Sequence, residues 1–153
     1  MTFSNATIST KLKVKKCCFI GMPGAGKTFI SAKWSELSGM RKVELDASIE
    51  NQMQSSIEDI VNKFGESFFR HVEGQMLKKA IEEEGILIDT GGGVVERKEN
   101  RTLLGKHCLV MYLFSPLQVL MHRLRGKEFR KRPLLKNLDQ NQLSSLFNKR
   151  HIL

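Results

Sequence analysis

The segment Gly21-Met-Pro-Gly-Ala-Gly-Lys27-Thr28 combines residue types and a spacing that suit phosphate chemistry. It fits the pattern G-x-x-x-x-G-K-[ST], whose glycines let successive backbone N–H groups turn inward around an anion. The Lys27 ammonium can reach the β- and γ-phosphates, and the Thr28 hydroxyl can bind Mg²⁺. An apolar run precedes the motif and a plausible helix follows it, so the context predicts a nucleoside triphosphate site. The predicted nucleotide contacts are Gly24, Ala25, Gly26, Lys27, Thr28 and Phe29.

The composition is that of an ordinary globular protein, with 41% apolar and 27% charged residues in a chain of 153. No run approaches the roughly 20 apolar residues of a membrane span, and the N-terminus lacks an apolar signal core. Cys17, Cys18 and Cys108 are interpreted as buried thiols of a reducing compartment. We therefore expect a cytoplasmic protein without a membrane partner, and we expect it to be a monomer.

The charge balance has two interpretations. Lys and Arg number 25 against 16 Asp and Glu, a net charge of +9, which can indicate a nucleic-acid partner. A site for a triphosphate and an anionic substrate needs cations too, and the basic residues do not alternate with aromatic ones as a single-strand platform requires. We expect no nucleic-acid partner. Residues 1–15 hold part of the excess charge and no acidic residue, and are expected to be a disordered basic extension.

Strand and helix signals alternate along residues 16–153, which predicts one three-layer α/β/α domain around a parallel sheet. The expected strands are 16–21, 42–45, 86–89 and 108–114. The expected helices are 27–38, 47–53, 56–64, 66–84, 116–125 and 138–150. Ser56 is the expected N-cap of the third helix, with Asp59 three residues on. The charge-dense stretch 126–136 lies between two helices and is interpreted as a mobile lid.

Five blocks, in this order, carry a resemblance to a known family. They are Gly21–Thr28, Asp46–Glu50, Gly65–Glu73, Gly91–Gly93 and Arg132–Leu135. The chain resembles shikimate kinases, P-loop kinases of the nucleoside monophosphate kinase-like superfamily. The first block is shared with many unrelated NTPases, whereas the triple glycine and the Arg-Pro-Leu-Leu block are more specific. The resemblance implies ATP-dependent phosphorylation of the shikimate 3-hydroxyl, with Mg²⁺, in chorismate and aromatic amino-acid synthesis.

The resemblance also implies the substrate contacts. Arg70 and Arg150 would hold the substrate carboxylate, which guanidinium groups bind in bidentate fashion. Glu73, one helical turn after Arg70, would orient its guanidinium. Asp46 would accept the proton of the attacking hydroxyl or orient that hydroxyl. The backbone of Gly91, Gly92 and Gly93 would approach the substrate closely, because glycine has no side chain to prevent it.

On the nucleotide side the resemblance adds two arginines. Arg132, together with Lys27 and Mg²⁺, would stabilise the charge on the transferring phosphoryl group when the lid closes. Arg125 matches the position where the family often stacks an arginine on adenine, although Arg123 or Arg130 could serve instead. The resemblance thus assigns catalytic roles to Lys27, Asp46 and Arg132.

The chain departs from the family at two acids near the phosphates. The family usually has Asp-x-Asp where this chain has Glu44-Leu45-Asp46, and Glu44 would hold a water on Mg²⁺. Asp89 ends an apolar strand at a position where the family more often has a small residue. Asp89 either supports Mg²⁺ or caps the following glycine turn. The predicted metal contacts are Thr28, Glu44 through water, and Asp89.

A third departure is the end of the chain at Leu153, where family members continue with another strand and a final helix. We expect the last edge strand to be absent, with marginal stability and weakened adenine binding. Two alternatives to the kinase follow: a truncated homologue that binds nucleotide without catalysis, and a P-loop kinase of another hydroxy acid such as gluconate. The presence of every substrate-side residue favours an active enzyme.

Overall fold

The computed structural model describes residues 14–124, 134–135 and 138–153. Its centre is a sheet with the order β2-β3-β1-β4, in which every pairing is parallel. The strands are β1 Lys16–Ile20, β2 Arg41–Glu44, β3 Ile86–Asp89 and β4 Leu109–Tyr112. Phe19 pairs with Asp89, which in turn pairs with Glu44, so the carboxyl ends of three strands meet at one edge of the sheet. In parallel α/β sheets, ligands bind at the carboxyl ends of the strands.

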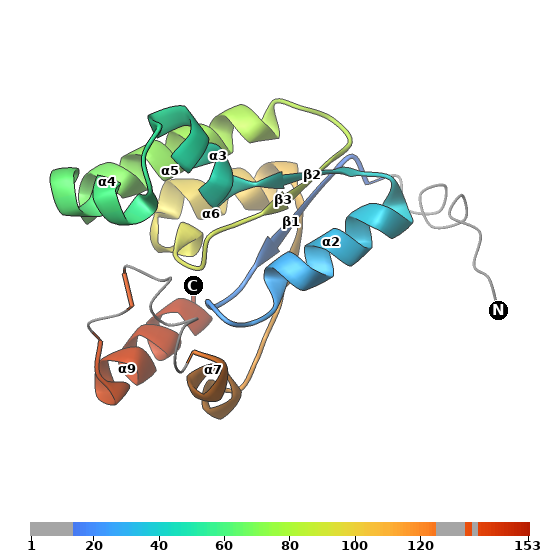
Figure 1. Ribbon diagram of the computed structural model, residues 1–153. Helices are drawn as coiled ribbons and strands as arrows, with labels where there is room; N and C mark the ends of the chain where they lie inside the picture. Colours follow the sequence, from blue (N-terminus) through green and yellow to red (C-terminus); the bar gives the residue numbers. More distant parts are fainter. Residues whose placement is uncertain (1–13, 125–133, 136–137) are drawn as a thin grey trace.

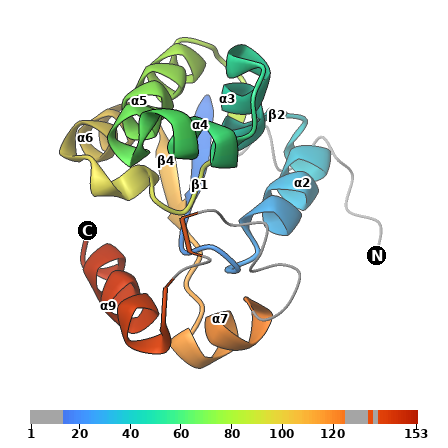
Figure 2. The same ribbon diagram turned by 60° about the vertical axis from the view of Figure 1, so that its left-hand side comes forward.

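Helices cover both faces of the sheet (Figure 1). Helix α2 lies on one side and helices α5 and α6 lie on the other, an arrangement that Figure 2 shows from a second direction. Helices α7 and α9 lie beyond the carboxyl ends of the strands. The helices are α2 Lys27–Ser38, α3 Leu45–Met53, α4 Ile57–Phe64, α5 Glu66–Ile81, α6 Lys98–His107, α7 Leu117–Arg123 and α9 Gln140–His151, with a 3₁₀ turn, η1, at Val94–Glu96.

Two apolar clusters position the site. The larger one lies between the sheet and α3–α6, and its fully buried members include Ile49, Leu77 and Ile88. The second cluster packs side chains of α7 and α9 against Met22 and Ala25 of the glycine loop. Because interiors are packed at crystal-like density, this cluster fixes α9 relative to the loop between β1 and α2.

The structure confirms the predicted parallel α/β architecture, and the predicted strands lie within two residues of the observed ones. The Ser56 cap is also present, since its Oγ accepts a hydrogen bond from the Asp59 backbone N–H at 3.1 Å. The prediction of a helix over 66–84 was wrong at its end, because α5 stops at Ile81. Residues 82–84 are three glutamates, and negative charge at a helix C-terminus opposes the helix dipole.

Helix α6 and the turn η1 were not predicted from the sequence. Only Asn100 and Leu104 are buried in α6, so the segment shows no apolar stripe. Its N-cap, Arg97, makes no capping hydrogen bond through its side chain. The helix is therefore stabilised by its packing on α5, η1 and β4, and not by an apolar stripe or a side-chain cap of its own.

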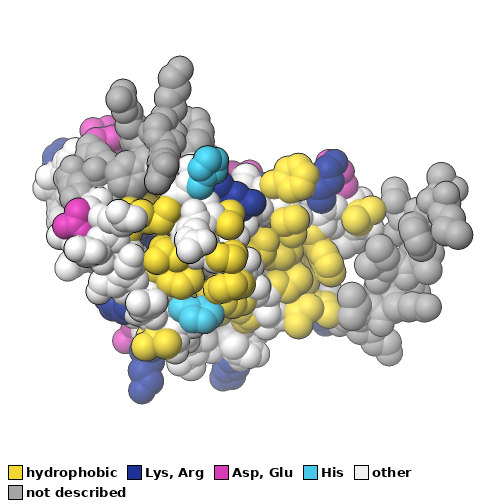
Figure 3. Space-filling model, turned by 90° about the horizontal axis from the view of Figure 1, so that it is seen from below, with side chains coloured by type: hydrophobic (Ala, Val, Ile, Leu, Met, Phe, Trp, Pro, Cys, Tyr) yellow, Lys and Arg dark blue, Asp and Glu magenta, His cyan; other side chains and the backbone are white. Residues whose placement is uncertain are grey.

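Strand β4 lies at an edge of the sheet, and its outer side is apolar. Leu109, Tyr112 and the following Phe114 are exposed. Figure 3 shows hydrophobic side chains gathered across the face seen from below, the side on which α7 and α9 lie in Figure 1. Among the described residues, no helix has both the length and the apolar character needed to cross a bilayer.

Candidate active site

The glycine loop between β1 and α2 forms the first part of the site. Gly24 and Gly26 have φ angles of 83° and 95°, which favour glycine over residues with a side chain. Helix α2 then begins at Lys27, so the N–H groups of its first turn face the hollow of the loop. The Lys27 side chain is buried, and its Nζ donates hydrogen bonds to the carbonyl oxygens of Gly21 at 2.8 Å and Met22 at 3.2 Å. Its ammonium is thus held within the loop.

A cavity of about 220 Å³ lies over this loop and brings together the residues predicted to bind phosphate and metal. It is lined by Gly24, Gly26, Lys27, Thr28, Phe29, Glu44, Asp46, Asp89 and Thr90. Ala25, also predicted as a contact, is buried beneath the loop in the cluster shared with α7 and α9. The contacts predicted in the glycine loop and in the first turn of α2 therefore line one concave surface, apart from Ala25.

The residues around the 220 Å³ cavity fit Mg²⁺. The oxygen donors of Thr28, Glu44, Asp46 and Asp89 are the ligand type that this ion prefers. In the described part of the chain, no three acidic, histidine or cysteine side chains form a ready-made metal site. Mg²⁺ takes most of its ligands from phosphate and water and only one or two from carboxylates.

Lys42 lies between Glu44 and Asp89, the two acids predicted to support the metal. It was not among the residues predicted from the sequence. Its Nζ is 2.9 Å from Glu44 Oε1 and 3.7 Å from Asp89 Oδ2, and it donates to the Thr28 carbonyl oxygen at 3.3 Å. Lys42 precedes Glu44 by two residues on β2, so both side chains lie on one face of the strand. This i, i+2 pairing of opposite charges was the signal available in the sequence.

The Asp89 carboxylate is 6% exposed and accepts a hydrogen bond from Ser31 Oγ at 3.1 Å. Among the described residues it makes no hydrogen bond to the backbone of the glycine turn that follows it. The hydroxyl of the neighbouring Thr90 instead donates to the Phe19 carbonyl oxygen, at 2.8 Å. Ser31 and Lys42 are therefore the partners that the structure shows for the Asp89 carboxylate, and its support of Mg²⁺ stays a prediction.

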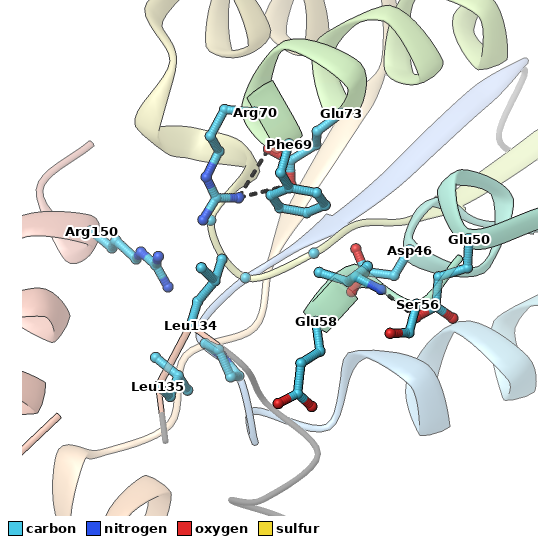
Figure 4. A pocket seen from close by; sticks show the side chains of 15 residues that line it. Asp46, Glu50, Ser56, Glu58, Phe69, Arg70, Glu73, Leu134, Leu135 and Arg150 are labelled. Atoms are coloured by element: carbon cyan, nitrogen blue, oxygen red, sulfur yellow. Dashed lines mark hydrogen bonds and ion pairs between the residues drawn. The ribbon is translucent and has the colours of Figure 1, made fainter. Parts of the chain in front are cut away.

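A second, larger cavity of about 440 Å³ adjoins the first. Its lining includes the substrate residues predicted from the resemblance: Asp46, Arg70, Gly91, Gly92, Gly93 and Arg150. Figure 4 shows the guanidinium groups of Arg70 and Arg150 pointing toward the same space, with Asp46 on another side of it. Asp46 lines both cavities and therefore lies where the phosphate hollow meets the arginine pocket.

The triple glycine has a structural role besides the one that the resemblance implies. A Cβ on Gly91 would lie 2.7 Å from Asp46 Oδ1, and a Cβ on Gly93 would overlap the Arg70 guanidinium. In both cases the added Cβ would lie closer to its neighbour than real Cβ atoms do in proteins. These glycines therefore leave room for two functional side chains, in addition to any approach of the backbone to a substrate.

Arg70, on α5, is held by two carboxylates of its own helix. Its Nη1 donates to both oxygens of Glu73 at 3.1 Å, and its Nη2 donates to Glu66 Oε1 at 3.0 Å. Glu73 is fully buried. Burial raises the pKa of the Glu73 carboxyl, and the neighbouring Arg70 charge opposes that rise. Burial alone would lower the pKa of Arg70, but the charge of Glu73 raises it overall. Glu73 thus holds Arg70 as the resemblance implies.

Arg150, in the last turn of α9, pairs with a different acid. Its Nε donates to Glu96 Oε1 at 2.9 Å, and its Nη2 contacts the same oxygen. Burial lowers the pKa of the Arg150 guanidinium, and Glu96 opposes that fall. Glu96 was also missed by the sequence analysis. Its position three residues after Gly93 gave no signal, because its partner is 54 residues away.

Several predicted residues lie outside the described residues: Arg125, Arg132 and most of the expected lid over 126–136. The described lid residues Leu134 and Leu135 line the 440 Å³ cavity. Arg123, at the end of α7, donates from Nη1 to the Gly24 carbonyl oxygen at 3.1 Å, so one described cation of this region does reach the glycine loop.

Comparison with known proteins decides the family. Residues 23–153 match the model of the shikimate kinase family, "SKI: Shikimate kinase". The chain belongs to the shikimate kinase family. Curated relatives include the shikimate kinase of Dictyoglomus turgidum, 40% identical over 134 residues that make up 86% of this chain and 77% of the relative. The shikimate kinase of Persephonella marina is 32% identical over 131 residues, which cover 86% and 78% of the two chains.

Solved structures of the same family share the fold. Shikimate kinase from Acinetobacter baumannii, solved in complex with shikimate, superposes with a TM-score of 0.87 at 27% identity, over 97% of this chain and 80% of that one. Shikimate kinase from Aquifex aeolicus superposes with a TM-score of 0.78 at 25% identity, over 90% and 80% of the two chains. The likeness to the family therefore extends from the sequence to the fold.

Proposed function

We propose that this chain transfers the γ-phosphoryl group of ATP to the 3-hydroxyl of shikimate. The observation that carries the proposal is the position of Asp46, which lines both the phosphate hollow and the arginine pocket. A carboxylate at this junction would meet an acceptor hydroxyl and the transferring phosphoryl group together. Membership of the shikimate kinase family supports the same activity.

On the substrate side, Arg70 and Arg150 would bind the shikimate carboxylate, because both line the 440 Å³ cavity and guanidinium groups suit bidentate pairing. Asp46 would orient the 3-hydroxyl and accept its proton as the bond to phosphorus forms. Phosphoryl transfer passes through a loose transition state, so correct placement contributes more than the basicity of the carboxylate. The backbone of Gly91–Gly93 would border the bound ring.

On the nucleotide side, the α2 N-terminus and Lys27 would hold the phosphates of ATP. Mg²⁺ bound in this hollow would supply positive charge against the negative charge of the phosphates. Thr28 would contact the ion directly, Glu44 would act through a water molecule, and Asp89 would add support from β3. Arg132 would complete the cationic surroundings of the phosphoryl group, and Arg125 would lie against adenine.

The organisation of the chain is part of the proposal. Residues 1–15 would be a basic extension and 16–153 one kinase domain, with substrate-binding helices over about 46–84 and a lid over about 126–136. The protein would act as a cytoplasmic monomer in aromatic amino-acid synthesis, without nucleic-acid or membrane partners. A degenerate nucleotide binder and a gluconate kinase are not favoured, because the curated relatives at 32–40% identity are named shikimate kinases.

Release of ADP, measured with ATP and Mg²⁺ in the presence and absence of shikimate, tests the proposal. Wild type should release ADP only when shikimate is present. Lys27→Ala should lower that rate by about 10²–10³-fold or more, because it removes a cation from the transition state. Lys33→Ala, which removes an exposed charge from the same helix, is the matched control. ADP release that is independent of shikimate, or unaffected in Lys27→Ala, would contradict the proposal.

A further inference from the structure

Glu96 contacts both Arg70 and Arg150, the two arginines that line the 440 Å³ cavity. Its Oε1 accepts from Arg150 Nε at 2.9 Å and lies 3.9 Å from Arg70 Nη2. Its other oxygen accepts from Lys149 Nζ at 3.3 Å. Arg70 belongs to α5 and Arg150 to α9, so these contacts join two elements that are distant in the sequence. Within the described residues, Glu96 is the carboxylate that touches both guanidinium groups.

The two guanidinium groups need such a partner because both are largely buried. Arg70 and Arg150 are 9% and 8% exposed, and each is charged. Two like charges in a low-dielectric site repel each other, and an unpaired buried charge is strongly unfavourable. Arg70 has Glu66 and Glu73 in addition, whereas the hydrogen bonds of Arg150 in the described part of the chain go to Glu96. Without Glu96, the Arg150 guanidinium would be an unpaired buried charge, so a conformation in which it turns from the end of α9 toward water would be favoured.

Glu96 contacts the arginines from outside the substrate cavity. It lines a separate hollow together with Glu66, Ser67, Arg70, His71 and Arg97, and it is not among the residues that line the 440 Å³ cavity. Arg70 borders both hollows, so its guanidinium lies between Glu96 and the substrate space. Glu96 therefore supports the arginines from behind and does not occupy the place of a substrate carboxylate.

We propose that Glu96 is a positioning residue that holds Arg150 beside Arg70, so that the two guanidinium groups together receive the carboxylate of the substrate. The inference rests on the proposed function, because it assumes an acidic substrate. Glu96 lies in η1, three residues after Gly93, so it also connects α9 to the glycine turn that borders the same cavity. A purely structural role for Glu96 would change stability without selecting one substrate.

Glu96→Gln tests the inference, because it keeps the size of the side chain and removes its charge. We expect the KM for shikimate to rise about tenfold or more, since a charge-assisted hydrogen bond contributes roughly that much. The KM for ATP and kcat should change by less than about threefold. Calorimetric binding of shikimate without nucleotide should weaken by the same factor. Glu99→Gln removes the same charge from an exposed side chain nearby and should leave all four quantities unchanged.

A double-mutant cycle separates positioning from stability. If Glu96 acts through Arg150, Glu96→Gln should have almost no further effect on shikimate binding in an Arg150→Met background. Glu96→Asp should recover part of the affinity, and thermal melting reports whether each variant is folded. An unchanged or lowered KM for shikimate in Glu96→Gln would overturn the inference, as would equal losses for ATP and shikimate. A wild type that binds no shikimate would refute the proposed function and the inference together.

Discussion

The backbone of Gly93 lies directly against the guanidinium of Arg70, so closely that a single added methyl group would overlap it. Arg70 is fixed on its other side by the fully buried Glu73, at 3.1 Å from both carboxylate oxygens. The guanidinium is therefore confined between a helix neighbour and the turn after β3. The triple glycine and the arginine of α5, which are separate motifs in the sequence, form one structural unit.

Gly93→Ala is predicted to displace Arg70 and to weaken shikimate binding. The added Cβ cannot be accommodated unless the guanidinium moves, because interiors are close-packed. We expect the KM for shikimate to rise by about tenfold or more, the effect of losing a charged hydrogen bond, with a much smaller change for ATP. Steady-state kinetics with each substrate varied in turn gives both values.

Gly105→Ala is the matched control for that variant. Gly105 lies in the exposed part of α6, and a Cβ there would meet nothing within 4 Å. The substitution should leave both KM values unchanged and stabilise the helix by about 0.5–1 kcal/mol, because alanine is the better helix former. Equal effects of Gly93→Ala on ATP and shikimate would show that the turn acts on the whole domain and not on Arg70.

Asp46→Asn is predicted to lower kcat more than it raises either KM. The amide has nearly the same shape as the carboxylate, so it still fits beside Gly91, but it accepts a proton poorly. Loss of a group that takes the proton typically costs about 10²–10⁴-fold in rate, and we expect the lower end of that range because Asn keeps the placement of the side chain. Single-turnover kinetics isolates the chemical step. A kcat within a few-fold of wild type would remove Asp46 from that step.

Asp89→Ala is predicted to weaken nucleotide binding only when Mg²⁺ is present. Asp89 lines the phosphate hollow together with Glu44, and Lys42 lies 3.7 Å from its carboxylate. If Asp89 supports the ion, ADP affinity measured by calorimetry should fall in Mg²⁺ buffer and stay constant in chelator. Glu36→Ala removes an exposed acid from α2 and is the control. A similar loss in both buffers would mean that Asp89 orders the loop through Ser31 instead.

The acid stability of the protein is predicted to depend on Glu96. Burial alone would raise the pKa of this carboxyl, but the hydrogen bonds and charge of Arg150 hold the pKa below its usual value. Because the folded-state pKa is depressed, Glu96 stabilises the fold above the unfolded pKa of about 4.3, and this contribution is lost as the pH falls through the folded pKa. The pKa of Glu73 is shifted in the opposite direction, but Glu73 is present in wild type and in Glu96→Gln alike, so it does not contribute to the difference between them.

Melting temperatures of wild type and Glu96→Gln between pH 3 and 7 measure that contribution. Wild type should melt higher at pH 6–7, and the difference should shrink as the pH falls below the unfolded pKa of about 4.3, because the Glu96 contribution is lost on protonation. A difference that stays constant over the whole range would assign the stabilisation to packing and not to charge.

The sequence was most informative where a function depends on a short local motif. The glycine loop, Asp46 and the triple glycine each lie at a strand end that periodicity and turn residues locate, and the parallel sheet then brings them together. Arg70 and Glu73 share one helix face, so the resemblance and the spacing of three residues together predicted their pairing. In the structure these residues line the two adjoining cavities, and their roles there stay predictions.

The residues that the sequence did not predict act through contacts set by tertiary packing. Glu96 meets Arg150 across 54 residues, and the docking of α9 on the glycine loop decides that contact. Lys42 lies beside Asp89 because β2 and β3 pair in one particular register. Helix α6 has few buried residues and no side-chain cap, so its packing and not its own pattern determines it.

Identification of the reaction product tests whether this chain phosphorylates the 3-hydroxyl of shikimate. The chain should be incubated with ATP, Mg²⁺ and an equal amount of shikimate, and the product examined by phosphorus and proton nuclear magnetic resonance. We predict one phosphate ester, on the 3-hydroxyl, formed in equal amount to ADP and at a rate lowered about 10²–10³-fold or more with Lys27→Ala. An ester at another hydroxyl, or ADP with free phosphate and unmodified shikimate, would contradict it.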